Sequence, residues 1–156
     1  MKKILSLTLA LAMLGTALTG CGSKTAAPET SVEPTQQTAP YQQEQSQTEK
    51  ALALINTFAT GDTDTARSLL SDGYIQHNLA YGTGADAFIG SVEYLASADV
   101  KTTVDNIRAF EDGDKVFLQT IYNFAGAGEQ VAFDIFRFDE DGKIAEHWDV
   151  METIAD

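Results

Sequence analysis

The chain has 156 residues and a formal net charge of −13 at pH 7, with 10 lysines and arginines against 23 aspartates and glutamates. This length suffices for one ordinary domain. So acidic a balance argues against nucleic-acid binding and against electrostatic adhesion to anionic lipid, because both need a basic face.

The N-terminus has the pattern of a secretory signal. Lys2 and Lys3 precede an apolar segment that runs from Ile4 to about Leu18. This segment is too short to span a bilayer as a stable anchor, and small residues follow it. Residues 1–20 are therefore predicted to be a signal peptide that is removed.

The signal ends in Leu18-Thr19-Gly20-Cys21, which resembles the lipobox of bacterial lipoproteins. The resemblance implies that diacylglycerol is attached to the sulfur of Cys21 and that cleavage makes Cys21 the new N-terminus. The alternative is an ordinary cleaved signal followed by an incidental cysteine. The lipoprotein interpretation predicts a protein of the cell envelope, held by lipid on the extracytoplasmic side of a membrane.

A polar linker follows the cysteine. Residues 22–47 contain all three prolines, and Val32 is the one aliphatic residue beyond alanine. Such a segment cannot bury enough apolar surface to offset its ordering entropy. Residues 21–47 are predicted to form a disordered tether, and residues 48–156 the folded domain.

The first half of the domain is predicted to be helical. Apolar residues recur at helical spacing from Thr48 until Gly61 stops the run. Asp62-Thr63-Asp64 is a helix-start signal for a short second helix that ends near Ser71. A third helix is expected to begin around Gly84. Between them, "YIQHN" at 74–78 has the character of a short strand.

The second half is predicted to be an antiparallel meander. Four extended segments cover roughly 101–111, 114–125, 129–138 and 143–151, and the joints EDGD and DEDGK carry the Asp-Gly signal of tight hairpins. Helices followed by a meander indicate an α+β domain. Three helices are expected to pack on a curved antiparallel sheet of four main strands, in a cone-like barrel with a pocket at its open end.

The third extended segment carries a carboxylate among aromatic residues. In "VAFDIFRF", at 131–138, alternation puts Asp134 on the same face as Phe136 and Phe138. Aromatic surface removes hydration from a carboxylate, which in general raises its pKa and lets it carry protons near neutral pH. An ion pair with Arg108 or Arg137 is the structural alternative.

The partner of Asp134 on the fourth segment depends on the hairpin joint. If Glu140-Asp141-Gly142 is a three-residue loop, Asp134 lies opposite Trp148 and Phe136 lies opposite Glu146. His147 and Asp149 then lie on the other face of the sheet. A joint one residue different would place Asp134 opposite His147 instead.

Neither acidic joint matches the spacing of a calcium-binding loop, so no metal site is predicted. His77 precedes a Gly-containing loop, a common position for the rim of a pocket, although loop histidines are often plain surface residues. Trp148 is expected in the core or the pocket wall, and Glu146 faces solvent if the strand twists at its start.

Residues 49–154 resemble the SnoaL-like polyketide cyclase family, within the nuclear transport factor 2 and ketosteroid isomerase fold group. The segments that carry the resemblance are Tyr74-Ile-Gln-His-Asn78, Asp134-Ile-Phe-Arg137 and Gly142-Lys-Ile-Ala-Glu-His-Trp-Asp-Val150. The resemblance implies three helices over a bent sheet that encloses an apolar cavity, often in a homodimer. Leu79 stands where similar proteins commonly have a proline.

The resemblance implies cofactor-free aldol chemistry, in which an acidic side chain removes a proton next to a carbonyl. It assigns Asp134 as general acid/base, with His77 and Asn78 holding the substrate oxygen. Trp148 would form a pocket wall, Glu146 or His147 would assist, and Tyr74 belongs to the same substrate-binding set.

Two functions follow as hypotheses. The first is an envelope-anchored module that binds a small apolar molecule. The alternative is an acid/base enzyme of aldol cyclase, isomerase or dehydratase type, which uses Asp134 on a small carbonyl compound.

Overall fold

The computed structural model describes residues 44–155. The predicted signal peptide, Cys21 and most of the predicted tether lie outside these residues. Among the residues described, no helix has both the length and the apolar character needed to cross a membrane.

Three α-helices form within residues 44–155: α1 (Gln47–Thr60), α2 (Thr63–Leu69) and α3 (Ala85–Ser97). Ser46 and Glu49 cap the start of α1 reciprocally, each side chain accepting the backbone N–H of the other residue. Gly61 ends α1 with φ 75°, and a Cβ at this position would lie 2.7 Å from the Cβ of Ala96. Only glycine fits this close approach of α1 to α3.

The described residues also form one five-stranded sheet, in the order β1-β5-β4-β3-β2. The strands are β1 (Leu70–Gln76), β2 (Thr103–Asp112), β3 (Lys115–Asn123), β4 (Glu129–Phe138) and β5 (Ile144–Thr153), with a short 3-10 helix at Phe124–Gly126. The four predicted strands form the antiparallel meander. The sheet as a whole is mixed, because β1 adds a fifth strand parallel to β5.

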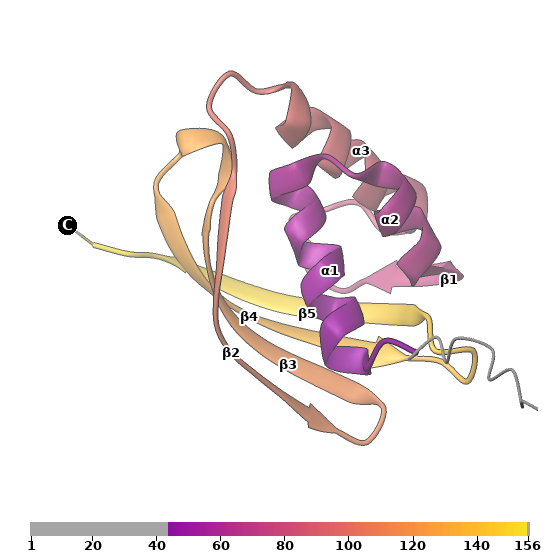
Figure 1. Cartoon of the computed structure of the whole chain (residues 1–156). Helices are drawn as coiled ribbons and strands as arrows, with labels where there is room; N and C mark the ends of the chain where they lie inside the picture. The colour runs from indigo at the N-terminus through magenta and orange to yellow at the C-terminus, as the bar shows by residue number, and fades with distance from the viewer. Residues whose placement is uncertain (1–43, 156) are drawn as a thin grey trace, which may run out of the picture. The chain divides into compact units, whose positions relative to one another are not determined.

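The three helices cover one face of the curved sheet (Figure 1). Leu54 and Ile55 of α1 and Val92 of α3 are buried with Leu118 and Phe136, which point inward from β3 and β4. The opposite, outer face carries the alternate residues of each strand. The predicted α+β class and the packing of helices on one face are thus confirmed.

The predicted register between β4 and β5 is wrong. The turn forms as expected: Asp139 and Lys143 are hydrogen-bonded, Gly142 has φ 68°, and Phe138 pairs with Ile144. A β-bulge then shifts the pairing by one residue, so that Arg137 pairs with Glu146 and Ala145 is the extra residue.

The shift exchanges the two faces of β5. Asp134 pairs with Asp149, and Phe136 pairs with His147, so both expected partners of Asp134, Trp148 and His147, are incorrect. His147 and Asp149 therefore lie on the inner face with Asp134, and Glu146 and Trp148 lie on the outer face.

Candidate functional site

A cavity of about 530 Å³ lies between the helices and the inner face of the sheet. Aromatic side chains form much of its wall. Phe58 of α1 lies 4.9 Å from Phe88 of α3 and 5.7 Å from Phe124, measured between ring centroids, and Phe124 stacks on Tyr122 at 4.9 Å. This wall offers apolar surface to a small molecule.

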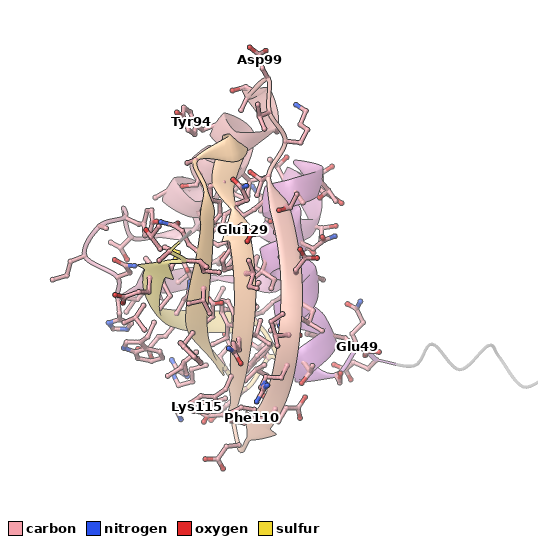
Figure 2. The ribbon with its side chains drawn as sticks, turned by 90° about the vertical axis from the view of Figure 1, so that its left-hand side faces the viewer. Glu49, Tyr94, Asp99, Phe110, Lys115 and Glu129 are labelled. Atoms are coloured by element: carbon pink, nitrogen blue, oxygen red, sulfur yellow. The ribbon has the colours of Figure 1, made fainter. Side chains whose placement is uncertain are left out.

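The mouth of the cavity is marked by exposed lining residues. Tyr81 and Tyr94 both line the cavity, and 48% and 74% of their surfaces are exposed. Figure 2 shows Tyr94 at the end of the domain opposite Phe110 and Lys115, which lie by the β2–β3 turn. The cavity therefore opens away from that turn.

Three ionisable side chains gather on the strands that line the cavity. Asp134 comes from β4, and His147 and Asp149 come from the adjacent β5. Their side chains are 4%, 5% and 4% exposed. His147 Nε2 lies 3.2 Å from Asp134 Oδ1 and 3.8 Å from Asp149 Oδ2. The cluster is reached from solvent through the cavity.

Neutral groups complete the hydrogen bonding of the cluster. The Tyr122 hydroxyl donates to Asp134 Oδ2 at 3.0 Å. Asn78 and Gln76 donate from their amide nitrogens to the two oxygens of Asp149. Tyr74 Oη lies 3.3 Å from His147 Nδ1. Two carboxylates thus lie in a largely apolar site and are held by uncharged donors.

The protonation of His147 follows from its neighbour Gln76. The backbone N–H of Asn78 donates to Gln76 Oε1 at 3.0 Å, which fixes the orientation of the Gln76 amide. Gln76 Nε2 then donates to His147 Nδ1 at 3.0 Å, so Nδ1 is an acceptor. We assign a neutral His147 whose Nε2–H donates to Asp134.

The buried tyrosines of the cluster are held in their protonated form. Burial raises the pKa of Tyr74, and the Asp149 and Asp134 carboxylates raise it further. Burial beside Asp134 also raises the pKa of Tyr122 well above its ordinary value. Both hydroxyls therefore remain hydrogen-bond donors at neutral pH.

The sequence predicts that His77 and Asp134 face the same substrate. In the structure they do not, because Asp134 lines the cavity and His77 does not. Its Nε2 lies 2.8 Å from Glu146 Oε2, and its ring stacks on Trp148 with the centroids 4.3 Å apart. Arg137 completes this outer cluster with a 2.5 Å ion pair to Glu146. Hydrogen bonds from His77 and Arg137 lower the pKa of Glu146.

Of the other predicted site residues, Tyr74 and His147 line the cavity, and Asn78 supports it through Asp149. Tyr122 and Gln76 were not predicted from the sequence, and Asp149 was assigned to the wrong face. The sequence pattern could have identified Tyr122 as an inward-facing residue, because it follows Val116, Leu118 and Thr120 at every second position of β3. Gln76 lies in the segment Tyr74–Asn78 that carries the family resemblance, but its contact with His147 depends on the pairing of β1 with β5.

Among residues 44–155, one group of side chains has ligand atoms close enough together to hold a metal ion. The group is Asp134, His147 and Asp149, and its ligand atoms all lie within 4.8 Å of one another. The assigned tautomer does not favour this use. The ring nitrogen that faces both carboxylates carries a proton, and a metal would have to displace it.

Known structures share this fold. An NTF2-like protein of unknown function from Cytophaga hutchinsonii is 16% identical, with a TM-score of 0.60 over 71% of this chain and 94% of its own. An LEH-like epoxide hydrolase from M. tuberculosis is 18% identical, with a TM-score of 0.59 over 68% and 82%. IdmH, a putative polyketide cyclase from Streptomyces antibioticus, is 18% identical, with a TM-score of 0.56 over 69% and 93%.

At these identities the solved structures establish the fold and nothing finer. A search of curated protein sequences gives no match. The profile of the SnoaL-like domain matches residues 51–147, which is more than half of the chain and includes Tyr74, Asp134 and His147. The chain therefore belongs to the SnoaL-like domain family.

Proposed function

We propose that this protein is an envelope-anchored lipoprotein whose SnoaL-like domain binds a small, largely apolar molecule in its cavity. The observation that carries the proposal is the aromatic-walled cavity of about 530 Å³ with its buried polar cluster. Its size suits a small organic molecule, and its few polar groups would fix the orientation of that molecule.

Ligand binding is tested by a thermal-shift screen of small ketones and of sterol-like and polyketide-like acids. A ligand that binds the folded state raises the unfolding temperature by mass action. Gly90 is an exposed residue that lines the cavity, and a Cβ there meets no heavy atom within 4 Å. Gly90→Trp is therefore expected to fill the cavity mouth and abolish the shift.

The matched control is Gly73→Trp. Gly73 lies in β1, is exposed, and also has open space around a Cβ, but it does not line the cavity. This variant should keep the shift. If Gly90→Trp leaves ligand binding unchanged, the cavity is not the binding site.

A second function, proton transfer on a carbonyl compound, is favoured by the contact between His147 and Asp134. Asp134 would take a proton from the carbon next to the carbonyl, and the hydrogen bonds from His147 and Tyr122 would hold its carboxylate in position. Tyr74, with its raised pKa, could donate to the developing enolate oxygen. This route needs no cofactor.

The anchoring part of the proposal rests on Cys21 and the lipobox-like residues before it. Cys21→Ser should move the protein from the detergent phase to the aqueous phase in a detergent partition of cell extracts, because the hydroxyl cannot form the thioether. Ser31→Ala, in the predicted tether, should leave the partition unchanged. A Cys21→Ser protein that stays in the detergent phase would contradict lipid attachment at this residue.

We further propose that two copies of the chain associate through the outer face of the sheet. A cross-strand row of apolar residues runs through Phe110, Phe117, Ile135 and Trp148. His77 stacks on Trp148 at one end of this row, and the helices lie on the opposite face of the sheet (Figure 1). An apolar surface of this kind is typical of an interface. Arg137 and Glu146 form an ion pair on the same face, so these two residues add no net charge to the interface.

Val150→Glu is expected to convert the dimer to a monomer in sedimentation experiments, since Val150 is 67% exposed on this outer face. Burying an unpaired charge in the interface would cost several kcal/mol. Leu79→Glu introduces the same charge at a fully exposed loop position and should leave the dimer intact. A wild-type chain that sediments as a monomer at high concentration would refute the association.

A further inference from the structure

The charges in the cavity are not balanced. Asp134 and Asp149 both line it, and no lysine or arginine is present among the described residues of its wall. The donors to these carboxylates are neutral: the Tyr122 hydroxyl, the amides of Gln76 and Asn78, and the Nε2–H of a neutral His147. Buried carboxylates are ordinarily paired with a positive charge.

The aromatic wall meets this cluster directly. Tyr122 bonds Asp134 and stacks on Phe124, and the Tyr74 ring packs edge-on against Phe88 at 6.0 Å. The face of an aromatic ring attracts cations, most strongly at a site shielded from water. A site that places carboxylates beside aromatic faces is therefore suited to bind an organic ammonium group.

We propose that the ligand of this cavity is an organic cation, with a protonated amine placed at the Asp134–Asp149 cluster and an apolar body along the aromatic wall. The inference rests on the proposed binding function and names the class of its ligand. The amine supplies the positive charge that the cavity wall does not. Anionic ligands, including the acids of the thermal-shift screen, are expected to bind worse than neutral ones. The Asp134 and Asp149 carboxylates lie 3.2 and 3.8 Å from the same His147 nitrogen and would repel a negative charge.

A metal ion is the other cation that these side chains could hold. Two observations favour the organic cation. His147 presents a protonated Nε2 to both carboxylates, and Gln76 holds it in that tautomer. The cavity is also far larger than an ion requires, and much of its wall is aromatic.

The test uses three probes that differ in one group: 4-phenylbutylamine, 4-phenylbutan-1-ol and 4-phenylbutanoate, titrated by calorimetry at pH 7. The amine is expected to bind about 10-fold or more tightly than the alcohol, since a hydrogen bond to a charged group is worth more than a neutral one. The carboxylate is expected not to bind. Asp149→Asn should remove most of the preference for the amine over the alcohol.

Asp105→Asn removes an exposed carboxylate from β2 and should leave the preference unchanged. If the three probes bind equally well, or the alcohol binds best, the cationic ligand class is wrong while the binding function stands. If none of the three binds, and the broader screen also finds no ligand, the binding function itself is wrong. Tight binding of Zn²⁺ or Mn²⁺ that displaces the amine would make the cluster a metal site and overturn the inference.

Discussion

Replacing Asp134 with Asn is expected to slow the exchange of α-hydrogens of a bound ketone by about 10²- to 10⁴-fold, the usual contribution of a positioned general base. The amide keeps the shape of the carboxylate but cannot take up the proton. The assay follows deuterium incorporation from D₂O by NMR for a panel of small cyclic ketones and aminoketones, so the natural substrate need not be identified first.

The control for this experiment is again Asp105→Asn, whose exchange rate should equal that of the wild type. Tyr122→Phe removes one hydrogen bond to Asp134 but leaves the carboxylate, and should slow exchange less than Asp134→Asn does. Two outcomes would refute proton transfer by Asp134: a wild-type protein that accelerates exchange of no ketone, and an Asp134→Asn variant that exchanges at the wild-type rate.

Phe136→Ala is expected to lower the free energy of unfolding by about 3–5 kcal/mol. Phe136 is fully buried at the centre of the sheet, and its ring stacks on His147 with the centroids 4.2 Å apart. The substitution loses apolar burial and leaves a void beneath the polar cluster. Because domains of this size have only about 5–15 kcal/mol of stability, the loss should be plain in urea denaturation.

Phe110→Ala is the matched control, because it removes the same ring from a position that is 57% exposed on β2 (Figure 2). Measured on chains diluted until they are monomeric, so that the proposed interface does not contribute, it should cost about 1 kcal/mol or less, as expected for a surface position. Equal losses for the two variants would mean that the inner face of the sheet is not the core of the domain.

Much of the fold could be predicted because its signals are local. Gly61 ends α1 and Gly142 closes the β4–β5 turn, each with the positive φ that glycine adopts freely. Alternation in β4 correctly placed Asp134 on the same face as Phe136 and Phe138, and all three are buried in the structure. These features depend on the residues next to them in the chain.

The candidate site could not be predicted in full because it depends on a bulge. Ile144 and Ala145 are both buried, and their succession breaks the alternation of β5 so that His147 instead of Trp148 reaches the cavity. The parallel pairing of Gln76 with His147 joins residues 71 positions apart, which local patterns do not encode. Both features result from tertiary packing.

The central claim is that the face of β5 with His147 and Met151 binds the ligand, and that the face with Trp148 does not. The most direct test is an NMR titration with 4-phenylbutylamine that follows the Met151 methyl group, which lines the cavity, and the indole N–H of Trp148, the one tryptophan in the chain. We expect the Met151 signal to shift with saturation while the Trp148 signal stays in place. A saturating shift of Trp148 with Met151 unmoved would contradict the account.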